Sequence, residues 1–211
     1  MGGVLTVATS ASASASAAAA HAPKRRFTRE ELEAARAKTL DDVIADGLAV
    51  LFCGINPGLR SAASGEHFGN PANRFWPALF NSGFTPRLLS ADEQRDLLPL
   101  GLGITNVVRR TTARADELMK AELIAGAKAV RELVTTRKPR WLAVLGVTAY
   151  RAAFELKDAA IGLQDEKIGE TCVWVLPNPS GLNAHYTPAK LAAEFERLRI
   201  AAGIRRAGCR A

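Results

Sequence analysis

Four short apolar runs separated by longer helical stretches constrain the fold of this chain more than any other feature. They predict strands at residues 48–55, 104–108, 141–145 and 171–176. Apolar runs of this length without polar alternation are typical of strands buried on both faces, as in parallel sheets. Buried strands that alternate with helices therefore predict an α/β fold, a three-layer α/β/α sandwich with a mainly parallel central sheet.

Capping signals place the helices between these strands. Thr28 with Glu31 predicts a capped helix to about residue 39, and Ser90 with Glu93 predicts a second one. Further helices are expected at 73–82, 117–137 and 148–154, and a last one begins near the Thr-Pro pair at 187–188 and runs to about residue 200.

Residues 1–26 are Ala/Ser-rich and end in three basic residues, which favours a disordered tail over a signal peptide. The rest, 27–211, is expected to form a single domain.

Composition favours a soluble protein that binds a polyanion. The 211 residues include 28 Lys and Arg against 21 Asp and Glu, a net charge of +7, and such an excess attracts nucleic acid, although many basic proteins bind none. No apolar run approaches the ~20 residues that cross a bilayer. Three dispersed cysteines and three histidines indicate no disulfide framework, iron–sulfur cluster or zinc site. We therefore expect a cytoplasmic protein without metal or cofactor.

Two loops with an Asn-Pro pair each follow a predicted strand. They read Gly-Ile-Asn-Pro-Gly-Leu at 54–59 and Pro-Asn-Pro-Ser-Gly-Leu at 177–182. If the two strands are parallel neighbours, both loops emerge at the carboxyl edge of the sheet, where α/β proteins bind ligands. An Asn side chain there can hold a water or read a base edge, but it is no strong general base. Alternatively, each loop is a plain turn in which Asn caps the local backbone.

Other residues between and beside these loops are candidates for contact with DNA. Phe68, in a Gly-rich stretch, can stack on an extruded base or simply pack under a loop. Arg109 and Arg110, soon after Asn106, can meet phosphates or belong to a solvated surface. His185 can contact phosphate or cap the last helix.

Four segments together resemble one known family. GINPGL from residue 54, NPANRFW from 70, GITNVVRRTT from 103 and NPSGLN from 178 are similar in order and spacing to the motifs of the mismatch-specific uracil/thymine DNA glycosylases. These form family two of the uracil-DNA glycosylase superfamily, and the likeness covers about residues 48–200. It implies a three-layer α/β/α enzyme that flips uracil, weakly thymine or other damaged bases, out of G·U or G·T mismatches. The glycosidic bond is then hydrolysed without cofactor or metal.

The resemblance also implies roles for individual residues. Asn56 positions the hydrolytic water, Phe68 stacks on the base, Ser61 lies beside its fifth carbon, and Asn106 and Thr112 contact it. The implied base pocket comprises Gly54, Ile55, Pro57, Gly58, Ser61, Phe68, Asn106, Thr112 and Asn178. The implied wedge, which enters the base stack and contacts the widowed guanine, comprises Pro179, Ser180, Gly181, Leu182, Asn183 and His185. The chain departs from the family at Ala184, where relatives often carry an Arg as the plug.

The motifs contain no Lys that could form a Schiff base with the sugar, so lyase activity is not expected. The expected partner is double-stranded DNA with a G·U or related mismatch, and the protein is expected to act as a monomer in base excision repair. Two alternatives remain open. One is a non-catalytic nucleic-acid-binding module that uses the same loops and the basic face. The other is a small-molecule enzyme, such as a nucleoside hydrolase, that uses the edge of the parallel sheet.

Overall fold

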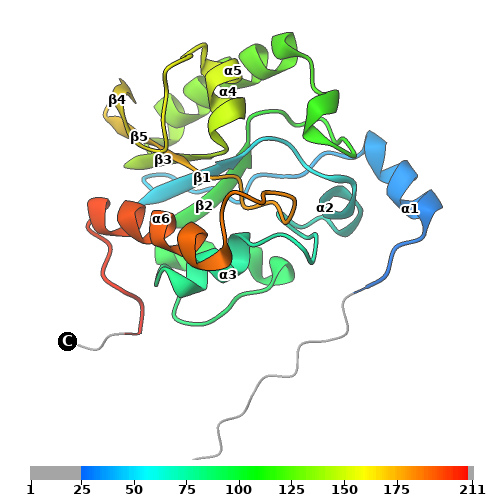
Figure 1. Ribbon diagram of the computed structural model, residues 1–211, viewed down its shortest axis with the longest axis horizontal. Helices are drawn as coiled ribbons and strands as arrows, with labels where there is room; N and C mark the ends of the chain where they lie inside the picture. Colours follow the sequence, from blue (N-terminus) through cyan, green and yellow to red (C-terminus); the bar gives the residue numbers. More distant parts are fainter. Residues whose placement is uncertain (1–24, 209–211) are drawn as a thin grey trace, which may run out of the picture.

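A computed structural model describes residues 25–208, and its central element is a five-stranded sheet (Figure 1). The strands are β1 (Val50–Gly54), β2 (Leu102–Asn106), β3 (Trp141–Leu145), β4 (Gly162–Ile168) and β5 (Thr171–Leu176). Their order is β2-β1-β3-β5-β4, with only β4 antiparallel to its neighbour. This arrangement confirms the predicted fold class. Residues 1–24 of the predicted tail lie outside the described residues.

The buried strands explain the apolar runs. All five residues of β1 are buried, with Phe52 in the core on one face of the sheet and Leu51 and Cys53 in the core on the other. A strand covered on both faces gains from apolar side chains at every position, and not only at alternate ones. β3 and β5 begin and end where they were predicted.

Two expectations about the strands need correction. β2 begins and ends two residues earlier than predicted, because Val107 and Val108 already belong to the following loop. Their amides donate to the carbonyls of Gly54 and Ile55 at 2.9 Å each, so the loops after β1 and β2 stay side by side. The antiparallel edge strand β4 was not predicted at all.

Helices cover both faces of the sheet (Figure 1). α3 (Phe75–Asn81), α6 (Pro188–Ala201) and the 3-10 helix η2 (Ala91–Leu100) lie on one face, and α4 (Lys120–Arg137) and α5 (Val147–Phe154) on the other. The short helix α2 (Leu59–Ser64), which was not predicted, follows β1 and packs against α1 (Arg29–Ala34) and η1 (Ala35–Ala37). A last 3-10 turn, η3 (Ala115–Glu117), precedes α4. Among residues 25–208, no helix has the length and apolar character required to span a membrane.

The predicted helix starts are largely confirmed. At α1 the Thr28 hydroxyl accepts from the Glu31 amide at 3.2 Å, and the Glu31 carboxylate accepts from the Thr28 amide at 2.8 Å. Thr187 caps α6 in the same way through the amide of Lys190. The segment after Ser90 has its capping box too, but it forms a 3-10 helix that contains Pro99. Proline lacks an amide proton and disturbs the regular α-helical ladder.

The strand order determines where a ligand can bind. The sheet grows in one direction from β1 to β2 and in the other from β1 to β3, and the crevice at such a reversal is the usual ligand site of open α/β sheets. The two Asn-Pro loops leave β1 and β5 at this carboxyl edge, as predicted. However, these two strands are not neighbours, because β3 lies between them.

Candidate active site

A pocket opens at the carboxyl edge of the sheet, between the loops that follow β1, β2 and β5. It brings together all ten residues that the sequence assigned to catalysis and the base pocket, and these are Gly54, Ile55, Asn56, Pro57, Gly58, Ser61, Phe68, Asn106, Thr112 and Asn178. Of the implied wedge, Pro179 and Ser180 also line the pocket. Eight further residues line it as well: Leu40, His67, Asn70, Asn73, Ala113, Arg114, Ala115 and Leu145.

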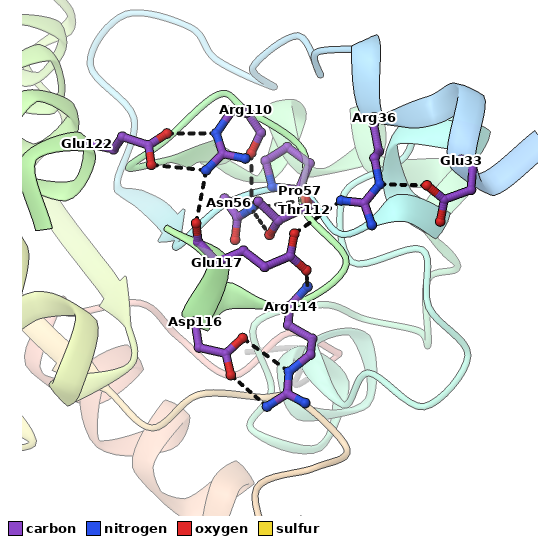
Figure 2. Close-up of polar contacts among 10 residues, drawn as sticks. All are labelled: Glu33, Arg36, Asn56, Pro57, Arg110, Thr112, Arg114, Asp116, Glu117 and Glu122. Atoms are coloured by element: carbon purple, nitrogen blue, oxygen red, sulfur yellow. Dashed lines mark hydrogen bonds and ion pairs between the residues drawn. The ribbon is translucent and has the colours of Figure 1, made fainter. Parts of the chain in front are cut away.

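The side chain of Asn56 is fixed by its amide nitrogen (Figure 2). Asn56 Nδ2 donates to Thr112 Oγ1 at 2.7 Å and to the carbonyl oxygen of Arg110 at 3.0 Å, and it lies 3.3 Å from the carbonyl oxygen of Pro57. An amide nitrogen carries only two protons, so its donors are fully used. Among the described residues none donates to Asn56 Oδ1. The half-buried side chain therefore presents a free carbonyl acceptor in a fixed orientation.

The carbonyl that holds Asn56 is itself held by an ion pair (Figure 2). The guanidinium of Arg110 meets both carboxylate oxygens of Glu122 at 2.7 and 3.0 Å and donates to the carbonyl oxygen of Glu117 at 3.1 Å. The hydrogen bond from Arg110 lowers the pKa of Glu122 to about 2. Exposed ion pairs contribute little to stability. Here the two-point contact instead ties the loop after β2 to the first turn of α4.

Thr112 is buried beside Asn56. Its side chain is 1% exposed, its amide donates to the carbonyl of Pro57 at 3.2 Å, and it forms an isolated parallel bridge with Gly58. The loops after β1 and β2 thus continue the pairing of their strands as far as the pocket. In this arrangement the hydroxyl of Thr112 is an acceptor for Asn56.

Asn106 reaches the pocket because Gly54 has no side chain. A Cβ on Gly54 would lie 2.4 Å from Asn106 Oδ1 and 3.4 Å from the ring of Phe68. Asn106 Nδ2 lies 3.3 Å from Nδ1 of His67, and Nε2 of that histidine lies 3.0 Å from the carbonyl oxygen of Asp41. Because a carbonyl only accepts and an amide NH₂ only donates, His67 carries its proton on Nε2 and accepts at Nδ1.

His67 is the clearest site residue that the sequence did not reveal. It is 2% exposed, and burial lowers its pKa below the ordinary value of 6.5. It is therefore neutral near pH 7 and keeps its acceptor toward Asn106. The only sequence signal is its position next to Phe68 in the Gly-rich stretch.

Phe68 lies with one ring face against the core. Its ring stacks on Phe75 with centroids 4.1 Å apart and an interplanar angle of 26°. Its backbone has a φ of +53°, which is uncommon for a residue other than glycine and often marks a functional site. The buried hydroxyl of Ser61 accepts from the Gly69 amide at 3.1 Å and so holds this turn in place.

The loop between β5 and α6 contains the implied wedge. Asn178 Oδ1 accepts from the Ser180 amide at 2.9 Å, which is the turn-capping role considered as the alternative for this Asn. The side-chain Nδ2 of Asn183 donates to the backbone carbonyl of Asn178 at 2.9 Å. Leu182 is 93% exposed, the most exposed large apolar side chain of residues 25–208, and His185 is also exposed.

The two arginines predicted to contact phosphate both have carboxylate partners. Arg109 lies 2.9 Å from Asp42, and Arg110 pairs with Glu122 as described. Both guanidinium groups are about half exposed or more. A DNA phosphate at either residue would compete with a carboxylate that is already in place.

No metal centre is evident in the part of the chain that the structure describes. Residues 25–208 contain no cluster of three or more His, Cys, Asp or Glu side chains that could hold an ion. Cys53 is fully buried, and burial raises the pKa of its thiol. Cys172, in β5, is only partly buried.

Comparisons with known proteins concern the family and the fold of this chain. The sequence model of the Uracil DNA glycosylase superfamily matches residues 42–199, about three quarters of the chain, including both Asn-Pro loops. The chain is also similar to a solution NMR structure from Methanosarcina acetivorans that was described as a candidate uracil DNA glycosylase. The TM-score is 0.52 at 19% identity, over 77% of this chain and 98% of that one. At this identity the likeness concerns the fold alone.

Proposed function

This chain belongs to the uracil DNA glycosylase superfamily, and on that premise we propose that it is a monofunctional, mismatch-specific DNA glycosylase. It flips uracil, and more weakly thymine, out of G·U and G·T pairs and hydrolyses the glycosidic bond. Base flipping is favoured at a mismatch because unpairing costs less there. The proposal rests mainly on one observation, the fixed amide of Asn56 with its free carbonyl oxygen at the pocket.

Asn56 suits the task of holding a water. A carbonyl oxygen accepts a hydrogen bond from water and so orients the lone pair of that water, but it does not remove the proton as a carboxylate would. The nucleophile is therefore a weakly activated water that attacks the anomeric carbon as the bond to the base breaks. Positioning alone accounts for the contribution of Asn56.

Hydrogen-bond donors around the base stabilise it as the leaving group. As the glycosidic bond breaks, positive charge develops on the sugar and negative charge on the base. Fixed donors aimed at the base oxygens stabilise that charge as an oxyanion hole does. Asn106 is a candidate, because only one of its two amide protons is directed to His67. The ring of Phe68, backed by Phe75, offers its other face for stacking.

Leu182 is proposed as the wedge side chain. Leu182 is 93% exposed, and exposure of an apolar side chain to water is unfavourable. Insertion between stacked bases would remove that apolar surface from water and so favour binding. The loop that carries Leu182 also contributes Pro179 and Ser180 to the pocket, so insertion and base capture involve one segment.

The experiment is a substrate panel under single-turnover conditions. Purified protein in excess is incubated with end-labelled duplexes that contain one G·U, A·U or G·T pair, and with the single strand that contains uracil. The products are then treated with alkali. The proposal predicts alkali-dependent breaks at G·U, faster than at A·U, and slow breaks at G·T.

Two outcomes would count against the proposal. Equal rates at G·U and A·U would remove the mismatch preference, and a covalent DNA adduct trapped by borohydride would contradict the monofunctional mechanism. Binding of the duplex with no base release from any substrate would instead support a non-catalytic nucleic-acid-binding module.

A further inference from the structure

Arg74 has been assigned no role above, yet it makes four hydrogen bonds to one loop beside the pocket. It lies at the N-terminal end of α3, within the segment Asn-Pro-Ala-Asn-Arg-Phe-Trp. Its guanidinium donates to three backbone carbonyls of the loop between β5 and α6: those of Ser180 at 2.6 Å, Asn183 at 2.8 Å and Tyr186 at 2.5 Å. Its own amide donates to the carbonyl of Pro179 at 2.9 Å.

The loop also lies in close contact with the chain just before Arg74. A Cβ on Gly181 would lie 2.5 Å from the carbonyl oxygen of Ala72, so only glycine permits this approach. Asn73 lines the pocket from the same segment, and Ser180 lines it from the loop. Arg74 therefore joins the exposed loop to one wall of the pocket.

A guanidinium is well suited to this task. It has five N–H donors in a rigid planar fork and stays charged at every relevant pH, so it can bind several carbonyls at once without a proton equilibrium. Among the described residues Arg74 has no carboxylate partner, and the carbonyl dipoles of the loop take that place. The remaining bonds of the loop are short-range contacts among its own residues, such as that from Asn183 to Asn178.

We propose that Arg74 is a positioning residue that holds residues 179–186 ready for insertion into the DNA stack. This inference rests on the proposed glycosylase function. A loop that is ordered before binding pays no further ordering entropy when Leu182 enters the duplex. Extrusion from a duplex then depends on Arg74. Excision from a single strand, which needs no insertion, does not.

The test compares two substrates and three variants. Arg74→Met removes the guanidinium at similar length, and Arg74→Lys keeps the charge but loses the fork. Arg140→Met is the matched control, since Arg140 also donates to a carbonyl, that of Ala202 at 2.6 Å, but away from the pocket. For Arg74→Met we expect a loss of roughly tenfold to hundredfold on the G·U duplex, and a change within about twofold on single-stranded uracil. Arg74→Lys should lie between, and Arg140→Met should match the wild type.

Amide hydrogen exchange gives a readout that does not need activity. Exchange at residues 180–186 should quicken in Arg74→Met while the amides in the middle of α6 stay protected. Equal losses on duplex and single strand, or unchanged exchange in the loop, would overturn the inference. If Arg74→Met does not fold, Arg74→Lys alone must show the selective duplex loss. If the wild type releases no base from either substrate, the proposed function fails, and hydrogen exchange still decides whether Arg74 holds the loop.

Discussion

At the scale of single residues, the candidate site depends on side chains whose donors and acceptors are assigned by their neighbours. Asn56, which lines the pocket, donates to Thr112 and Arg110 through its side-chain nitrogen, and none of the described residues donates to its carbonyl oxygen. His67 accepts from Asn106, so that the amide of Asn106 has one orientation. Asn56 and Asn106, the two side chains to which the proposal gives chemical roles, are thus each oriented by a hydrogen-bonding neighbour. Changes to those partners should affect rate before they affect fold.

Replacement of Thr112 by valine tests the first of these partnerships. Thr112→Val keeps the shape but removes the acceptor at 2.7 Å from Asn56 Nδ2, so the amide loses its closest constraint. We expect the single-turnover rate on G·U to fall about tenfold, the equivalent of about 1.4 kcal/mol. The control is Thr135→Val, because Thr135 is exposed on α4 and bonds only to the carbonyl of Arg131. An unchanged rate in Thr112→Val would mean that Asn56 is held by the Arg110 carbonyl alone.

The buried His67 leads us to expect that both stability and excision rate decline at acid pH. Burial lowers its pKa below 6.5, so the unfolded chain takes up the proton first, and stability declines as the pH falls from about 6.5 toward the lower value in the fold. Protonation of His67 in the folded protein also places an N–H opposite the NH₂ of Asn106, so the excision rate should fall only as the pH approaches the lowered pKa of His67. His67→Gln should flatten both profiles, because a glutamine side chain does not titrate. Identical profiles for wild type and His67→Gln would contradict this role.

At the scale of elements, the position of the pocket follows from parallel strands that end at one edge. Gly54 is the last residue of β1 and pairs with Asn106, the last residue of β2. The side chain of Asn106 occupies the space that a Cβ on Gly54 would fill. The end of β1 must therefore be glycine for this pocket to keep its shape.

Gly54→Ala tests that requirement. The added Cβ would lie 2.4 Å from Asn106 Oδ1, so Asn106 must move. We expect a stability loss of about 1–3 kcal/mol and a fall of roughly tenfold or more in excision rate. Gly103→Ala is the matched control: its Cβ would lie 2.5 Å from Leu48 and from the Val43 carbonyl, away from the pocket. Denaturant unfolding should show a similar stability loss in both, whereas only Gly54→Ala should lose activity in the folded state. Equal activity losses would contradict the requirement.

The sequence predicted elements well where burial alone determines the pattern. The runs at 141–145 and 171–176 became β3 and β5 because both faces of each strand are covered. β4 was missed because its residues 163–167 alternate between exposed and partly buried and include three charged side chains. Charged edge strands of this kind resist pairing with other chains and show no apolar run.

Site residues were predictable only where a motif marked them. The structure brings the residues of the implied pocket together, but His67 and Arg74 were not assigned roles. Their partners lie far away in the chain: Asn106 is 39 residues from His67, and Ser180 is 106 residues from Arg74. Local propensity contains no information about such pairs. Only the fold determines them.

At the scale of the whole molecule, two apolar cores pack against the two faces of the sheet. On one face Phe52 lies among the rings of Phe75, Phe84 and Phe195, with centroids 5.4, 5.4 and 5.9 Å away. Phe75 in turn supports Phe68 at the pocket. The core and the site are therefore in direct contact.

Phe52→Ala should show this dependence on the core. Loss of a fully buried ring leaves a cavity and typically costs about 3–5 kcal/mol of unfolding free energy, measured by urea unfolding. Leu163→Ala is the control, since Leu163 on β4 is 60% exposed and its loss should change stability by about 0.5 kcal/mol or less. A loss below about 1 kcal/mol in Phe52→Ala would mean that the aromatic cluster is not the main support of the sheet.

The most direct test of the account separates chemistry from binding at Asn56. Single-turnover release of uracil from a G·U duplex and the Kd for the same duplex are measured for wild type, Asn56→Ala and the control Asn81→Ala. Asn81 is exposed at the end of α3, on the helical layer that covers one face of the sheet. The account predicts that Asn56→Ala loses about a hundredfold or more in rate with a Kd within about threefold of wild type, and that Asn81→Ala loses neither. A rate for Asn56→Ala within about threefold of wild type would contradict the assignment of Asn56 as the residue that positions the water.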